Sequence, residues 1–223
     1  TTASNNTAFG RAALGVNTTG TEHVAVGSLA LDANTTGNYN TAVGYNAVTS
    51  NTTGSENTAV GNSSLKANTT GANNTALGLG SLQHSTTASF NTAIGHAALY
   101  SNTTGANNTA VGHQAGTAIT TGAENTLVGK AAGTAITTGG SNVIMGRSAG
   151  KLTTTGGDNT AIGRSALQNN STGSSNTALG NDALLANTTS NNTAVGHNAA
   201  TANTSGGNVV AVGYKALEAH TTA

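Results

Sequence analysis

Apolar residues recur at fixed places in a short polar phrase that repeats along the whole chain. The commonest form of the phrase is Asn-Thr-Ala-Val-Gly, and its closing glycine returns every 17 residues, with a single interval of 16 between Gly180 and Gly196. The residue just before this glycine is always apolar. We call the glycine the corner glycine and the stretch from one corner to the next a coil. The corner glycines are Gly10, Gly27, Gly44, Gly61, Gly78, Gly95, Gly112, Gly129, Gly146, Gly163, Gly180, Gly196 and Gly213.

The alternation before the corner predicts a short β-strand. The apolar residue before the glycine and the Thr or Val two places earlier should face the core, while the Ala between them should face the other side. A second apolar pair, such as Ala98 and Leu99, follows three and four places after the corner and predicts a facing strand. Glycine and Asn-Thr-Thr recur too often for any long uninterrupted helix.

A unit of this size cannot bury its own apolar side, but stacked copies can pair their backbones about 4.8 Å apart. The sequence therefore predicts an all-β fold, a parallel β-solenoid or β-roll of about thirteen 17-residue coils. Such a stack would form a rod of roughly 60 Å. We expect residues 1–223 to be a single repeat domain. Because the chain begins and ends inside the repeat, we also expect a fragment of a longer fibrous protein.

Two further columns of the repeat predict structural roles. A second glycine follows the corner by ten residues in most coils, but Ala88 and Ser190 stand in that place, so the strict first glycine should mark the tight corner. Asparagine stands four places before the corner in eleven of the thirteen coils, with His23 and Val209 as exceptions. Stacked amides can hydrogen-bond along the axis, so this column predicts an asparagine ladder.

Three successive coils depart from the rule together. The leucine four places after the corner becomes glycine in each, while larger apolar residues appear at other places of the same coils. The glycines are Gly116, Gly133 and Gly150, and the larger residues are Ile119, Leu127, Ile136, Ile144 and Leu152. Apolar volume has moved rather than vanished, which predicts a change in the local cross-section or in the contact between chains. The alternative is neutral drift of a duplicated block of repeats.

Composition narrows the classes of function. Hydrophobic residues make up 35% of the chain and charged residues 6%, and seven basic residues balance seven acidic ones. No global field would therefore steer the chain to nucleic acid or to an acidic membrane surface. The sequence has no cysteine, and no apolar run is long enough to span a bilayer. We expect no nucleic-acid partner and no membrane insertion.

The most variable position is the one immediately after the corner, which indicates a solvent-facing ridge. Five consecutive members can carry positive charge: His96, His113, Lys130, Arg147 and Arg164. This basic ridge is our candidate ligand-binding site, suited to an acidic polysaccharide or to lipopolysaccharide phosphates. The alternative is a ridge that is merely solvated. An acidic column five places before the corner would cancel part of its field if it lies nearby: Glu22, Glu56, Glu124 and Asp158.

Motifs for catalysis are missing from the sequence. His96 and His113 lie one coil apart, but no third ligand for a metal stands at an obvious place. The seven acids are too scattered to suggest the carboxylate pair of a glycosidase. We therefore expect no catalytic residues, no metal, no cofactor and no enzymatic activity. Asn-Thr-Thr triplets match the N-glycosylation signal at Asn17, Asn34, Asn51, Asn68, Asn102 and Asn187, although the repeat explains them without a glycan.

The phrases Asn-Thr-Ala-Val-Gly, Ala-Leu and Asn-Thr-Thr-Gly resemble repeats in the shafts of phage tail fibres and related surface proteins that end in an endosialidase-type chaperone. They are also similar, more distantly, to the head repeats of YadA-like trimeric autotransporter adhesins. The second resemblance implies a left-handed β-roll packed as a homotrimer. The residues favour association independently, because a column of small side chains would let another surface approach closely. That column is Ala8, Ala25, Ala42, Ala59, Ala76, Ala93 and Ala110.

We therefore expect a structural or adhesive fibre segment, placed outside the cell, on a cell surface or on a virion. Its partners would be further copies of itself, as a homotrimer, and a host cell-surface polysaccharide or lipopolysaccharide. One alternative is a solenoid that binds ice or another flat surface through rows of threonine. Another is a carbohydrate-active enzyme, which the lack of an acid pair argues against.

Overall fold

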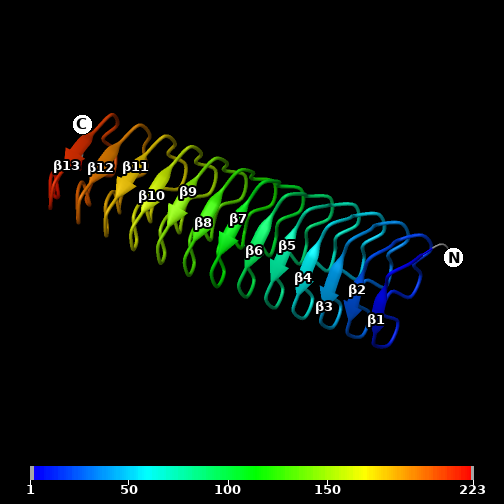
Figure 1. Cartoon of the computed structure of the whole chain (residues 1–223). Helices are drawn as coiled ribbons and strands as arrows, with labels where there is room; N and C mark the ends of the chain where they lie inside the picture. Colours follow the sequence, from blue (N-terminus) through cyan, green and yellow to red (C-terminus); the bar gives the residue numbers. More distant parts are fainter. Residues whose placement is uncertain (1–2, 222–223) are drawn as a thin grey trace. The chain divides into compact units, whose positions relative to one another are not determined.

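The computed structural model describes residues 3–221 as an all-β parallel β-solenoid, with thirteen strands and no helix in that range. The chain divides into two compact units, Thr1–Asn108 and Thr109–Ala223, which are described separately. The first unit holds β1–β6 and the second β7–β13 (Figure 1). The strands are β1 Thr7–Phe9, β2 Val24–Val26, β3 Thr41–Val43, β4 Thr58–Val60, β5 Thr75–Leu77, β6 Thr92–Ile94, β7 Thr109–Val111, β8 Thr126–Val128, β9 Val143–Met145, β10 Thr160–Ile162, β11 Thr177–Leu179, β12 Thr193–Val195 and β13 Val210–Val212.

Each strand pairs in parallel with the strand of the next coil, in the register that the repeat dictates. In the first unit Ala42 of β3 lies opposite Ala59 of β4. In the second unit Ala161 of β10 lies opposite Ala178 of β11. Identical residues therefore stack in columns, and the predicted parallel β-solenoid is confirmed within each unit.

The predicted facing strand is wrong, because each coil carries one strand and closes with stacked turns. Residues two and four places after the corner have positive φ, including the buried Leu82 at 49°. Because residues with positive and negative φ alternate in the turn, the peptide N–H and C=O groups there point along the axis of the stack. Thus the Leu31 N–H donates to the Ala47 carbonyl of the next coil at 3.0 Å, and the Leu29 N–H donates to the Arg11 carbonyl of the preceding coil at 2.9 Å. The turns form the same axial bonds that a strand would.

The two strand faces are the reverse of the prediction. The central alanine of the strand points inward and is 0% exposed in Ala42, Ala59 and Ala76, whereas Leu77 before the corner is 45% exposed. The reason is the narrow interior: a small residue on the strand leaves room for the buried leucine of the opposite turn, such as Leu65. The strand therefore presents its Thr and Val side chains to the outside, and its alanines form the core.

The coils that depart from the repeat confirm that volume is exchanged inside this core. Leu127 and Ile144, which replace the central alanine of β8 and β9, are fully buried. A Cβ on Gly133 would lie 3.0 Å from a Leu127 methyl group, and a Cβ on Gly150 would lie 2.6 Å from Ile144 Cδ1. A larger strand residue therefore excludes the usual leucine of the turn. Leu152 takes no part in this exchange, because it is 47% exposed, so its predicted compensating role is wrong.

The corner glycines occupy backbone space that other residues cannot. Their φ values lie between 126° and 140° in every coil. A Cβ on Gly61 would lie 2.6 Å from the carbonyl oxygen of Gly78, the next corner. Because the backbone is the obstacle, no side-chain movement would relieve the clash. The prediction that the first glycine marks the tight corner is confirmed.

The predicted asparagine ladder is present beside the strands, and we call it the strand-side ladder. Asn57 shows its bonding: the backbone N–H and side-chain Nδ2 donate to Asn40 Oδ1 at 3.0 and 3.2 Å, and Nδ2 also donates to the Gly71 carbonyl at 2.9 Å. In the second unit Asn159 makes the same three bonds, to Asn142 and to the Gly173 carbonyl. Each amide thus satisfies polar groups on two coils, so a buried polar column becomes stabilising.

A second, turn-side ladder is built by the asparagines of the Asn-Thr-Thr triplets. Asn51 Nδ2 donates to Asn34 Oδ1 at 2.8 Å and to the Gly54 carbonyl at 2.9 Å. Five of the six glycosylation-signal asparagines are 0% exposed: Asn34, Asn51, Asn68, Asn102 and Asn187. Their side chains lie inside the folded coil, where a glycan does not fit. These five triplets therefore serve the structure and not glycan attachment in this fold.

The turn-side ladder breaks at Ser85, and the break leaves unbonded polar atoms. Asn68 Oδ1 and Ser85 Oγ are buried without a hydrogen-bond partner. Ser85 lies in the same coil as Ala88, and Ala88 replaces the second glycine of that coil. In a regular coil a Cβ on Gly54 would lie 2.3 Å from the Gly71 carbonyl oxygen and 2.5 Å from Asn51 Oδ1, so alanine there crowds both the next coil and the asparagine of its own turn. Alanine at position 88 therefore requires a shorter side chain at position 85.

The 16-residue coil loses its residue in this same turn. Asn176 Nδ2 and Asn187 Nδ2 donate to the Thr189 carbonyl, at 2.9 and 2.7 Å, where other coils use the second glycine. Thr189, not Ser190, therefore takes the place of that glycine, which corrects the assignment made from sequence spacing. The strands are unaffected, since Ala178 of β11 still lies opposite Ala194 of β12.

His23 replaces asparagine in the strand-side ladder and reproduces its bonds. Nδ1 accepts a hydrogen bond from the Asn40 N–H at 3.2 Å, and the ring is also hydrogen-bonded to the Gly37 backbone. The backbone N–H of His23 donates to Asn6 Oδ1 at 3.0 Å. The side chain is 1% exposed, and burial lowers the pKa of His23 below its usual value. The ladder therefore requires the neutral ring.

Repairing the turn-side ladder should need two substitutions together. We expect Ser85→Asn alone to destabilise the chain, because its Oδ1 would meet the Cβ of Ala88. Ser85→Asn with Ala88→Gly should raise the free energy of unfolding by about 1–3 kcal/mol, since Asn68 Oδ1 gains a donor. Chemical denaturation of the two single variants and the double variant measures the coupling. Additive effects of the two substitutions would contradict the proposed clash.

Acid should weaken the coils around His23. The folded-state pKa is depressed, so the stability contributed by the neutral ring is present above about pH 6.5 and lost as the pH falls below it. We expect the wild type to lose more thermal stability than His23→Asn between about pH 7.5 and about pH 5. Melting followed by circular dichroism makes the comparison. Equal losses in both proteins would show that His23 does not titrate on unfolding.

Candidate functional site

The five residues of the predicted basic ridge are exposed at the start of the turn that follows each strand. His96 belongs to the first unit, and His113, Lys130, Arg147 and Arg164 belong to successive coils of the second. The backbone places them there because the corner glycine reverses the chain at the end of the strand. The structure nevertheless gives the four residues of the second unit different surroundings.

Lys130 and Arg147 line a shallow hollow of about 350 Å³ together with a third cation, Lys151. Gln114, Thr134, Ser148 and Ala131 complete its wall. Lys151 and Thr134 come from five places after a corner, where the turn returns beside the ridge. We call this set of seven residues the basic hollow. It contains three cations, two hydroxyl groups and one amide, and no carboxylate.

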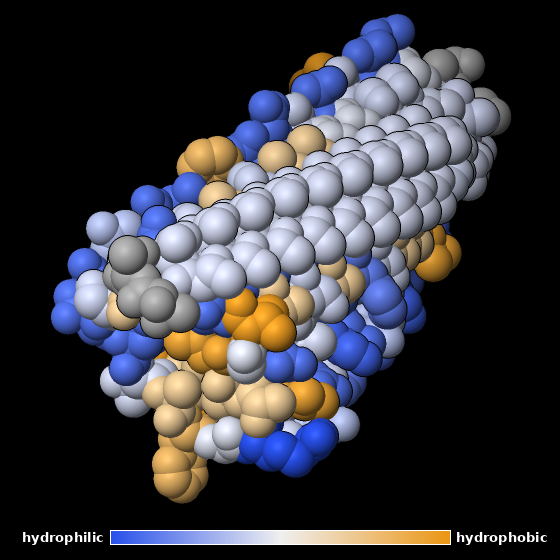
Figure 2. Space-filling view, turned by 90° about the vertical axis from the view of Figure 1, so that its right-hand side faces the viewer, coloured by the Kyte–Doolittle hydropathy of each residue, from blue (hydrophilic) through white to orange (hydrophobic). Residues whose placement is uncertain are grey.

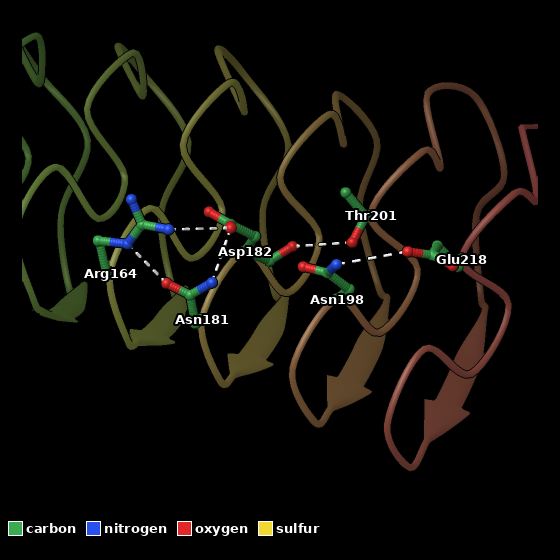
Figure 3. Close-up of polar contacts among 6 residues, drawn as sticks. All are labelled: Arg164, Asn181, Asp182, Asn198, Thr201 and Glu218. Atoms are coloured by element: carbon green, nitrogen blue, oxygen red, sulfur yellow. Dashed lines mark hydrogen bonds and ion pairs between the residues drawn. The ribbon is translucent and has the colours of Figure 1, made fainter.

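Arg164 lies outside the basic hollow and already has an anionic partner. Its guanidinium approaches Asp182 Oδ2 at 3.4 Å, and its Nε donates to Asn181 Oδ1 at 2.7 Å (Figure 3). Asn181 Nδ2 in turn donates to Asp182 Oδ2 at 2.7 Å. The five predicted residues therefore do not form one uniform ridge. His113 does not line the hollow either, so Lys130 and Arg147 are the two predicted residues that the structure brings together there.

In the coils after Arg164, a basic residue on the corresponding surface is paired with a carboxylate. Lys215 Nζ lies 3.1 Å from Glu218 Oε1, and this hydrogen-bonded partner raises the pKa of Lys215. Asn198 Nδ2 donates to the same carboxylate at 3.3 Å (Figure 3). Glu218 stands five places after its corner, the position of Lys151 in the basic hollow. The repeat thus places an acid in one coil where it places a base in another.

The acidic column does not neutralise the basic hollow. Neither Glu124 nor Asp158, the two members of that column in the second unit, lines it. Glu124 instead accepts a hydrogen bond from Ser141 Oγ at 3.4 Å. Lys130, Arg147 and Lys151 form no ion pair with any residue in the described range.

The chemistry of the hollow is that of anion binding. Ammonium and guanidinium groups donate charge-assisted hydrogen bonds to oxyanions, and neighbouring hydroxyl groups can add neutral ones. No group of three or more His, Cys, Asp or Glu side chains that could hold a metal occurs within residues 3–221. The hollow offers donors at fixed positions and no nucleophile paired with a base.

Lys151, Gln114, Thr134 and Ser148 lie outside the single column of the repeat that contains the basic ridge. They occupy the second and fifth places after the corner, and the positive φ values in the turn bring these places beside the first. The signal in the sequence was the local charge: Lys130, Arg147 and Lys151 lie within 22 residues that contain no acid. Counting charge by coil would have identified them.

Within the described residues no helix is long and apolar enough to cross a bilayer. Comparison of the chain with family models, with curated proteins and with solved structures finds no match.

Proposed function

We propose that the chain is a structural segment of an extracellular fibre, on a cell surface or a virion, with an additional adhesive role. The observation that supports this is the direction of its hydrogen bonds, which run from coil to coil in strands, turns and both asparagine ladders. Each added coil extends such a stack and stiffens it. The resemblance to tail-fibre shafts and adhesin heads agrees with this role and remains a hypothesis.

We also propose that copies of the chain associate through the outer strand face, as the homotrimer that the resemblance implies. The alanine column, first expected to provide this contact, is buried inside the coil from Ala25 to Ala110. The outer face carries Thr and apolar residues in flat columns instead. In the first unit Leu77 is 45% exposed on this face, and Val43 and Val60 are half-buried. Burying such a stripe against another copy removes apolar area from water.

The proposal predicts an elongated trimer in solution. Small-angle X-ray scattering should give a rod-like profile and a mass three times the 21.5 kDa of one chain. Leu77→Lys should weaken the association at least about tenfold, because it places a charge on the outer strand face. Leu79→Lys is the matched control, since Leu79 is 53% exposed but lies in the turn after the corner. A compact monomer, or equal effects of both variants, would contradict the proposal.

A second candidate, binding to ice or another flat repetitive surface, is favoured by rows of exposed threonine. Figure 2 shows residues of intermediate hydropathy, the range to which threonine belongs, in straight parallel rows. In the first unit the second threonine of each pair is exposed: Thr19, Thr36, Thr53, Thr70, Thr87 and Thr104. The first threonine is anchored, as when Thr52 Oγ1 donates to the Thr69 carbonyl at 3.0 Å. The result is a regular array.

Thermal hysteresis tests the second candidate directly. A chain that binds ice should depress the freezing point below the melting point, and Thr53→Lys should reduce the effect by interrupting the row. Ser63→Lys, on the opposite turn of the neighbouring coil, should leave it unchanged. Absence of hysteresis in the wild type would exclude ice binding and leave the fibre proposal unaffected.

A further inference from the structure

The basic hollow and the coils that follow it provide an internal comparison, because the repeat places equivalent residues two coils apart. Lys130 corresponds to Arg164, Arg147 to Asn181 and Ser148 to Asp182. All six residues belong to the second unit. Differences between the two places therefore come from the side chains and not from a different backbone.

In the later coils the acid Asp182 occupies the place between the basic residue and the neighbouring amide. Asp182 Oδ2 lies 3.4 Å from the Arg164 guanidinium and accepts a hydrogen bond from Asn181 at 2.7 Å. An anionic oxygen at this place thus bridges a cation of one coil and an amide of the next. The backbone there is fixed as well, since the Thr201 hydroxyl donates to the Asp182 carbonyl at 3.2 Å. The place is built to hold an oxyanion between neighbouring coils.

In the basic hollow the same place holds the hydroxyl of Ser148, and the number of cations rises to three. Arg147 replaces the neutral Asn181, and Lys151 adds a charge at the mouth. In the preceding pair of coils the Thr134 hydroxyl donates to the Gln114 carbonyl at 3.5 Å, the same bond that Thr201 makes to Asp182. Donors converge on a space of about 350 Å³ that contains no anion of the chain itself.

We propose that the basic hollow binds a sulfate or phosphate ester group carried on a polysaccharide, with the ester oxyanion near Ser148. Lys130, Arg147 and Lys151 donate charge-assisted hydrogen bonds to it, and Ser148 supplies a hydroxyl donor. The open, shallow form of the hollow admits one substituent of a chain that continues along the surface. The inference gives the ligand class for the adhesive part of the proposed function, on which it rests.

Weak contacts of this kind gain strength from repetition in an assembly. A single exposed charge pair contributes little free energy of binding, so one hollow binds an ester group weakly. Copies of the chain would each present one hollow, and a polysaccharide reaching several of them would bind with higher avidity. The same electrostatic origin makes the binding sensitive to salt.

Ser148→Asp supplies the test, because it copies the acid of the equivalent coil. Ser148 has a φ of 60° and Asp182 a φ of 56°, so the substituted residue suits the backbone. The new carboxylate should pair with Lys130 and occupy the place of the ester. Ser148→Asn is the matched neutral control, since Asn198 holds the same repeat position with a φ of 57°.

Binding is measured by fluorescence polarisation with a labelled, heparin-derived sulfated oligosaccharide at about 0.15 M salt. We expect Ser148→Asp to weaken binding about fivefold or more, and Ser148→Asn and Arg164→Gln to change it less than about twofold. The desulfated oligosaccharide should bind more weakly than the sulfated one. Circular dichroism of each variant checks that the fold is retained.

Three outcomes would overturn the inference: no binding of the sulfated oligosaccharide to the wild type, equal binding by Ser148→Asp, or an equal loss with Ser148→Asn. Inorganic sulfate separates the two sources of the oxyanion. If it competes as strongly, per sulfate group, as the oligosaccharide binds, the hollow is a site for free ions, and the assignment to a polysaccharide is wrong. The scattering experiment uses no ligand, so loss of this inference leaves the fibre proposal standing.

Discussion

Hydrogen bonding between neighbouring coils is the interaction on which the rest of the structure depends. A polar chain with 35% hydrophobic residues has little apolar area to bury, and much of its interior consists of amides. Burying them is tolerable only if each finds partners, and the coil above or below is the one source that the repeat guarantees. The strict spacing follows from this requirement, since a misplaced asparagine would leave two coils with unbonded groups.

The interior also has a fixed volume, which links the central strand residue to the turn that follows the corner. The turn can hold a large residue such as Leu65 only because the central strand residue is alanine. Where β8 and β9 instead contain Leu127 and Ile144, the turn position is glycine. The Ser85 and Ala88 pair obeys the same rule with polar atoms. Substitutions therefore occur in sets, each confined to a single coil and its neighbours.

The sequence was sufficient to predict the coil length, the parallel stacking, the corner glycine and the strand-side ladder, because each is a direct consequence of the period. The sequence was insufficient to show which strand residues face the core. In an alternating triplet such as Thr58, Ala59 and Val60, either the central residue or the two outer residues can point inward, and hydrophobicity wrongly favoured the outer two. The exchange between Leu127 and Gly133 held the answer, since residues that trade volume must share one interior. The basic hollow was found only in part, because a single column shows nothing of the residues that the turn brings beside it.

The 16-residue coil shows where the repeat accepts a change of length. One residue fewer between Gly180 and Gly196 alters the turn around Thr189, yet Ala178 and Ala194 remain opposite each other in β11 and β12. The one missing residue is therefore accommodated in this loop, outside the sheet. Variation can thus accumulate along one edge of the molecule while the arrangement of its surface columns is inherited intact.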